Sequence, residues 1–100
     1  MYIDDFGNIF DWDEDKNQAN IQKHEISFQE ASSSFNDDFA VVLPDETHSK
    51  GEERFLLIGF SDKERMLFVS HCYRDSDEIV RIISARKATR AEHRKYHSNY

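Results

Sequence analysis

The sequence has few of the residues that mark special classes of protein. It has one cysteine, Cys72, in 100 residues, which excludes an internal disulfide and a thiolate metal site. Its longest apolar runs, at 39–43 and 55–58, are far shorter than the roughly 20 residues of a membrane span. The acidic start, residues 1–6, lacks the basic and apolar regions of a signal peptide. We therefore expect a reduced, cytoplasmic protein with no membrane partner.

Proline and glycine are also scarce, with one and three copies, so turns must be recognised mainly from Asp, Asn and Ser. Hydrophobic residues make up 38% of the chain, which is enough for one modest core and too little for two. The sequence therefore predicts a single domain over residues 1–100.

Charge is distributed unevenly along the chain. The net charge is −7, but residues 1–53 hold 14 acidic and three basic side chains, whereas residues 54–100 hold six acidic and ten basic ones. The last twenty residues contain six Arg and Lys against Glu92 alone. Such asymmetry suggests one surface for a polyanion and another that repels the polyanion or attracts a basic partner. Solvated arginines on a charged helix end are the simpler alternative.

Capping patterns predict three helices. Asp13 is a good N-cap for a helix that reaches about His24. Ser27-Phe-Gln-Glu30 is a capping box that opens a second, short helix. Thr89-Arg-Ala-Glu92 is another, and opens a final helix that reaches about residue 96 or 97.

Four segments rich in Val, Ile, Leu or Phe are predicted strands, at about 39–43, 54–60, 66–74 and 78–85. The links 61–65 and 75–77 are short enough for antiparallel hairpins and too short for parallel crossovers. The predicted order is α-α-β-β-β-β-α. This is an α+β fold in which helices pack on one face of an antiparallel sheet.

Hairpin symmetry predicts the pairing within this sheet. Centring the last hairpin on Ser76 pairs His71 with Arg81, and centring the one before on Lys63 pairs Phe55 with His71. Alternation then predicts one core face and one mixed face. The predicted core face carries Leu56, Ile58, Phe60, Met66, Phe68, Cys72, Val80 and Ile82. The predicted mixed face carries Phe55, Leu57, Gly59, Val69, His71, Tyr73 and Arg81.

Several polar features have an ordinary structural explanation. The stripe of Lys16, Asn20, Lys23, His24 and Ser27 at helical spacing is typical of a solvated helix face. His93 and His97 lie four residues apart, but no carboxylate lies at matching spacing. We therefore expect these histidines to interact with the helix dipole and not to bind a metal. Cys72 falls on the predicted core face, where a thiol is usually inert.

Three sets of residues, in order along nearly the whole chain, resemble the BrnT family. They are Phe10–Asp13 with Lys16, Asn20, Lys23-His24 and Ser27–Ala31; His48-Ser49, Gly51–Phe55 and Ile58-Gly59; and Arg81–Thr89. The resemblance implies a RelE-like ribonuclease toxin that needs no metal cofactor. It also implies a partner, a BrnA-type antitoxin with a ribbon-helix-helix part. The toxin would contact operator DNA only through this antitoxin. The family commonly has Gly after Lys-His; this chain has Glu25, which predicts a different helix end.

Metal-free RNA cleavage needs cations to stabilise charge on the phosphate, together with a base and an acid. We assign Arg81 and Arg86 to the phosphate, because guanidinium groups match phosphate oxygens, and Lys23 as a further cation. His24 or His71 is the candidate acid or base. We expect Arg81 to lower the pKa of His71 as a neighbouring positive charge. The structural alternative for Arg81 is an ion pair with Asp77 or Glu78.

Two other functions remain open at this point. The chain could be a non-catalytic relative of such toxins that retains only antitoxin binding and operon control. It could also be a regulatory interaction protein with no nuclease ancestry. The acidic net charge favours these alternatives, because RNA is a polyanion.

Overall fold

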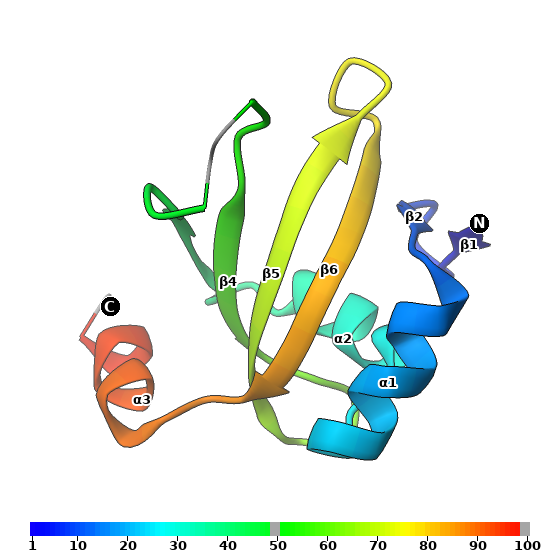
Figure 1. Cartoon of the computed structure of the whole chain (residues 1–100). Helices are drawn as coiled ribbons and strands as arrows, with labels where there is room; N and C mark the ends of the chain where they lie inside the picture. The colour runs from blue at the N-terminus through cyan, green and yellow to red at the C-terminus, as the bar shows by residue number, and fades with distance from the viewer. Residues whose placement is uncertain (49–50, 99–100) are drawn as a thin grey trace.

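The computed structural model describes residues 1–48 and 51–98 (Figure 1). Its elements are β1 (Tyr2–Ile3), β2 (Ile9–Asp11), α1 (Glu14–His24), α2 (Phe28–Ser33), the 3-10 helix η1 (Ser34–Asn36), β3 (Val41–Pro44), β4 (Phe55–Phe60), β5 (Met66–Arg74), β6 (Ile79–Lys87) and α3 (Arg90–His97). The α+β prediction is confirmed, with the three helices and four strands close to their predicted positions. The strands β1 and β2 were not predicted, because they are too short to give a periodic signal.

The six strands form one sheet in the order β1-β2-β6-β5-β4-β3. The hairpins β4–β5 and β5–β6 are antiparallel, as predicted from their short links, and β3 also pairs with β4 in antiparallel. The unpredicted strand β2 pairs with β6 in parallel, so that Asp11 lies opposite Arg81. The sheet is therefore mixed, and its N-terminal edge brings an acidic residue beside a candidate site arginine.

The predicted register is confirmed for one hairpin and wrong for the next. Phe55 pairs with His71 across β4 and β5, as predicted. Across β5 and β6, however, Cys72 pairs with Arg81 and His71 pairs with Ile82. The turn between these strands holds four residues, 75–78, instead of three, and residues 75–77 all have positive φ values, between 53° and 71°. The extra turn residue shifts the pairing by one.

A β-bulge further changes the alternation of β6. Ser70 pairs with Ser84, but the next residue of β5, His71, pairs with Ile82, so Ile83 is the extra residue. Arg81 and Arg86 therefore pair with Cys72 and Phe68, which are four residues apart on β5. Because residues an even number apart on a strand share a face, the bulge puts both arginines on one face.

Helices lie on both faces of the sheet, whereas we had predicted one. Phe28 and Ala31 of α2 pack against Leu57, Val69 and Ile82 in the main core. Tyr96 of α3 packs in a second cluster on the other face, with Val41, Ile58 and Met66. The predicted core face of β4 and β5 is thus the α3 side, and the predicted mixed face holds the main core. Both faces of these strands are apolar, so alternation could not identify which of them α2 covers.

Hydrogen bonds attach α1 to the edge of β6, because the helix has almost no apolar side chains. Ala19 and Ile21 are its only apolar residues, and its buried residues are Asn17 and Asn20. The Asn20 amide accepts from the Ala85 N–H at 3.1 Å and donates to the Ala85 carbonyl at 2.8 Å, as a neighbouring strand would. Asn20 therefore does not belong to the solvated face that the sequence suggested.

Glu25 ends α1 in the left-handed conformation, with φ 61° and ψ 25°, and its N–H donates to the Ile21 carbonyl at 2.8 Å. The prediction of a different helix end is therefore wrong: a glutamate occupies the conformation that suits glycine. A side chain in this conformation costs about 1 kcal/mol.

Replacing Glu25 with glycine is expected to raise the free energy of unfolding by about 0.5–1 kcal/mol, because glycine adopts positive φ without this cost. Urea denaturation at neutral pH measures the change, with Glu25→Ala as the matched control. The alanine variant removes the same carboxylate and keeps the β-carbon, so an equal gain in both variants would contradict a backbone origin.

Candidate functional site

Three arginines lie on the face of β5 and β6 opposite α2. We call this surface, which carries Arg74, Arg81 and Arg86, the arginine face. Each guanidinium is paired with a carboxylate: Arg74 with Glu52 at 3.1 Å, Arg81 with Asp11, and Arg86 with Glu92. The face is thus rich in guanidinium groups that are held in place by acidic partners.

The partner of Arg81 is Asp11, not Asp77 or Glu78 as the structural alternative proposed. The parallel pairing of β2 with β6 sets these two residues opposite each other. Both side chains are about one-third exposed, so an incoming anion can reach the guanidinium. The sequence could not predict this contact, because it joins residues 70 positions apart through a strand of three residues.

Arg86 is held more rigidly. Its two terminal nitrogens donate to the two carboxylate oxygens of Glu92 at 2.8 and 2.9 Å, and its guanidinium lies 4.2 Å from the centre of the Phe68 ring. Burial alone would raise the pKa of Glu92, but the hydrogen bonds from Arg86 and Thr89 outweigh it and lower this pKa. Glu92 also completes the capping box of α3, which connects Arg86 to the start of that helix.

Cys72 lies on the arginine face but is fully buried, opposite Arg81. Burial raises the pKa of its thiol, and the nearby Glu52 carboxylate adds to this effect. The side chain is therefore a protonated thiol at neutral pH, and the prediction of a buried, inert cysteine agrees with the structure.

His71 lies on the opposite face from Arg81, which corrects the predicted pairing of these two residues. Its side chain is fully buried among aromatic rings, with centroid distances of 4.8 Å to Phe35, 5.4 Å to Tyr73 and 6.1 Å to Phe55. The one-residue shift in the hairpin explains the error. A side chain enclosed in the core cannot reach a ligand on the arginine face, so we remove His71 from the candidate site.

Burial of His71 lowers its pKa to about 4, although a hydrogen bond between Nδ1 and the Val69 carbonyl acts in the opposite direction. The direction agrees with our expectation, but the cause is desolvation and not Arg81.

The low pKa of His71 predicts a stability that depends on pH. In the unfolded chain this histidine titrates near 6.5, so below that pH the unfolded state binds a proton that the folded state does not. Lowering the pH from 7 to 5 is therefore expected to remove about 2 kcal/mol of folding free energy through His71 alone. Urea denaturation at several pH values measures this loss. His71→Phe, which does not titrate, should lack this part of the pH dependence; an unchanged profile would contradict the assignment.

Lys23 and His24 are in the last turn of α1, on the far side of β6 from β5. Lys23 is exposed and His24 is half-buried. One turn before them, Asn20 binds Ala85, the residue next to Arg86. Figure 1 shows α1 alongside β6. Lys23 and His24 are therefore carried by a helix that is attached to the strand of Arg81 and Arg86.

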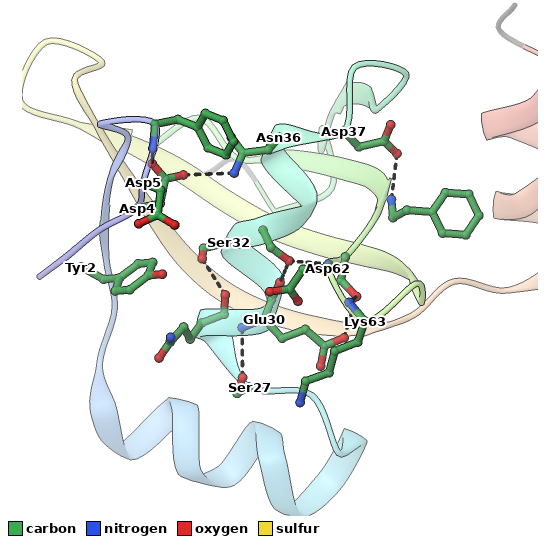
Figure 2. Close-up of a pocket in the computed structure, with 15 residues that line it drawn as sticks. Tyr2, Asp4, Asp5, Ser27, Glu30, Ser32, Asn36, Asp37, Asp62 and Lys63 are labelled. Atoms are coloured by element: carbon green, nitrogen blue, oxygen red, sulfur yellow. Dashed lines mark hydrogen bonds between the residues drawn. The ribbon is translucent and has the colours of Figure 1, made fainter.

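A second surface is acidic. A hollow of about 770 Å³ lies between the N-terminal turn, α2 and the β4–β5 turn (Figure 2). Its charged lining consists of Asp4, Asp5, Glu30, Asp37, Asp62 and Lys63. This excess of carboxylates repels a polyanion, so the hollow is not a site for RNA phosphates.

Within residues 1–48 and 51–98, no three His, Cys, Asp or Glu side chains come together as metal ligands do. None of the described helices is long and apolar enough to cross a bilayer.

The fold and the site define an α+β protein whose mixed sheet carries guanidinium groups suited to phosphate on one face. Comparison with protein families matches residues 12–92 to the ribonuclease toxin BrnT of type II toxin–antitoxin systems, and the chain belongs to this family.

Comparison with solved structures agrees with this assignment. The fold is similar to the crystal structure of the ribonuclease toxin BrnT from Brucella abortus, with a TM-score of 0.64 and 26% sequence identity. The match covers 83% of this chain and 99% of that one. A comparison with curated protein sequences found no match. The resemblance to the BrnT family, which the sequence motifs indicated, is confirmed.

Proposed function

We propose that this protein is a metal-independent endoribonuclease that inhibits translation by cleaving RNA and is neutralised by a BrnA-type antitoxin. The observation that carries the proposal is the placement of Arg81 and Arg86 on one face by the bulge in β6. Both guanidinium groups are bound to carboxylates, which are anions that an RNA phosphate can replace.

The two arginines serve different phosphates of one RNA strand. Their partners on β5 are four residues apart, which corresponds to roughly 13 Å along a strand. Arg81, which donates one hydrogen bond to Asp11, is the group for the reacting phosphate. Arg86 is held by two hydrogen bonds to Glu92, one to the Lys87 carbonyl and an aromatic ring, and binds another phosphate of the same strand.

In the proposed reaction, the ribose 2′-oxygen bonds to the adjacent phosphorus while the bond to the 5′-oxygen breaks. A base takes the 2′-OH proton and an acid protonates the leaving oxygen, which yields a cyclic phosphate and a 5′-OH end. Arg81 stabilises the charge that develops on the phosphate, and Lys23 adds positive potential. With His71 removed, His24 is the remaining histidine among the candidate acids and bases.

Purified protein tests the proposal directly. Incubation with RNA in excess EDTA, without ribosomes, should give fragments with cyclic phosphate and 5′-OH ends, and expression should arrest growth and protein synthesis. Absence of cleavage and of growth arrest would contradict the enzyme. Cleavage that stops in EDTA would contradict only metal independence.

The antitoxin should stabilise the toxin on binding. Free partner at 100 times its dissociation constant raises the free energy of unfolding by about 2.7 kcal/mol, which shifts the melting temperature of a 100-residue domain by about 10 °C or more. Mixing the toxin with the product of the neighbouring gene, which we expect to be a ribbon-helix-helix protein, measures this shift. No copurification and no shift would contradict the pairing.

A non-catalytic binding module is the second candidate. It is favoured by the carboxylate partners of Arg74, Arg81 and Arg86 and by the net charge of −7. Such a module would be harmless on expression yet would still copurify with the antitoxin.

A further inference from the structure

Some basic side chains of the protein form ion pairs with carboxylates and others do not. Arg65, Arg74, Arg81 and Arg86 have carboxylate partners. Within residues 1–48 and 51–98, the exposed lysines Lys16, Lys23, Lys63 and Lys87 have none, and neither do three further exposed residues, Arg90, Arg94 and Lys95. These three residues lie on α3, and we call them the α3 cation surface. Their charge is available to an external anion.

The packing of α3 directs this surface to solvent. Tyr96 is 2% exposed and anchors the helix, because its hydroxyl donates to Asp37 at 2.7 Å and its ring contacts Phe60 edge-on. Arg90 and Arg94 are four residues apart, so they share one side of the helix about 6 Å apart along its axis. Figure 1 shows α3 beyond the end of β6, at the margin of the sheet.

Stabilisation of the helix does not explain all of this charge. Arg94 and Lys95 are in the last turn, where positive charge is favourable to the helix dipole. Arg90, in contrast, is the first residue of the helix after the N-cap Thr89. A positive charge at that end is unfavourable to the dipole, so the dipole does not account for Arg90.

The α3 cation surface continues the arginine face. β6 ends at Lys87 and α3 begins at Arg90, and Glu92 of α3 holds the Arg86 guanidinium. A flexible polyanion lying along Arg81 and Arg86 therefore meets α3 next. Guanidinium groups in a row suit the phosphates of one strand.

We propose that Arg90, Arg94 and Lys95 form a binding surface for the backbone of single-stranded RNA, next to the site of cleavage. The inference rests on the proposed function and adds where the substrate strand leaves the site. It implies that the protein binds long RNA more tightly than a dinucleotide, and with a steeper dependence on salt.

The test compares two doubly substituted full-length proteins. Arg90→Gln with Arg94→Gln removes two charges from α3. Lys16→Gln with Lys63→Gln is the control, which removes two exposed charges elsewhere. The probe is a fluorescent 20-nucleotide RNA with 2′-O-methyl groups, which cannot undergo cleavage, and its affinity is measured by anisotropy from 50 to 200 mM salt.

Loss of two phosphate contacts should reduce the slope of log affinity against log salt by about 1.4, so the α3 variant loses about sevenfold less affinity over this salt range than the unsubstituted protein does. The control should keep its slope. Cleavage of a dinucleotide should be unchanged in the α3 variant, while cleavage of long RNA at low concentration falls. Melting curves of both variants check that each is folded.

Equal slopes in the unsubstituted protein and the α3 variant, or equal losses in the control, would overturn the inference. An α3 variant that binds RNA normally but no longer binds the antitoxin would identify a protein-binding surface, and would also overturn it. Each of these results leaves the proposed function standing if the unsubstituted protein cleaves RNA. If the unsubstituted protein neither binds nor cleaves RNA, both proposals fail.

Discussion

Replacing Arg81 with alanine is expected to slow RNA cleavage by about 10²–10³-fold and to relieve growth arrest. The guanidinium is fixed on β6 before substrate binds, and removal of one preorganised donor from a developing oxyanion costs on the order of 3–4 kcal/mol in the transition state. The variant also leaves Asp11 without its partner, and this added negative charge further weakens phosphate binding.

Single-turnover cleavage of RNA measures this effect, because it separates the chemical step from binding. Arg81→Lys is the matched control: it keeps the charge but loses the forked geometry, so its rate should lie between those of the other two proteins. Arg86→Ala should mainly raise the RNA concentration needed for half-maximal rate. Retained toxicity of a stably folded Arg81→Ala, Arg86→Ala double variant would remove both residues from the mechanism.

The largest expected effect on stability is that of Arg65→Ala, at about 3–5 kcal/mol. Glu30 is 4% exposed beneath the acidic hollow and accepts hydrogen bonds from Arg65 Nε at 2.9 Å and from the Ser61 hydroxyl at 2.7 Å. The second nitrogen of Arg65, Nη2, also binds Glu30. Removing the arginine leaves a buried carboxylate uncompensated, which is the costly way to break such a pair.

The pH dependence identifies the cause of this loss. Burial of Glu30 would raise its pKa, but the hydrogen bonds from Arg65 and Ser61 outweigh burial and lower it. The stability that Glu30 contributes is therefore present above its unfolded pKa, near 4.5, and is lost as the pH falls through its lower folded pKa. In Arg65→Ala burial dominates, so the carboxyl group should protonate above pH 4.5 and the defect should shrink in acid.

Urea denaturation at pH 7 and pH 5 measures both effects. Glu30→Gln combined with Arg65→Met removes the pair together and should recover much of the lost stability. A defect in Arg65→Ala that does not depend on pH would mean that lost packing, and not the buried charge, is responsible.

Local patterns in the sequence predicted the parts of the fold that depend on neighbouring residues. Asp13, Ser27 and Thr89 cap the three helices as expected, because a cap needs only the side chain and the next few N–H groups. The predicted capping box of α2 is only half formed, because the Glu30 carboxylate accepts from Arg65 and Ser61. The β4–β5 register followed from a turn of ordinary length. The BrnT resemblance came from short sequence motifs, because the spacing of polar and apolar residues alone does not identify a family.

The errors came from features without a local signal. Three consecutive left-handed residues, Asp75, Ser76 and Asp77, make a turn that residue preferences disfavour, and the pairing of β5 with β6 depends on it. The partnership of Arg81 with Asp11 needed a three-residue strand from the other end of the chain. His71 was placed in the site because the predicted register paired it with Arg81, whereas it pairs with the next residue, Ile82.

The bulged residue Ile83 makes β6 a strand with two phases. Residues 79–82 follow one inside–outside pattern and residues 84–87 follow the opposite one, and both keep their apolar side chains, Ile82 and Ala85, in the main core. If Ile83 were instead paired regularly in the ladder, the alternation would place Ala85 outside the main core and Arg86 off the arginine face. The continuity of the core and that of the arginine face therefore depend on the same bulge, although Ile83 itself contributes to neither.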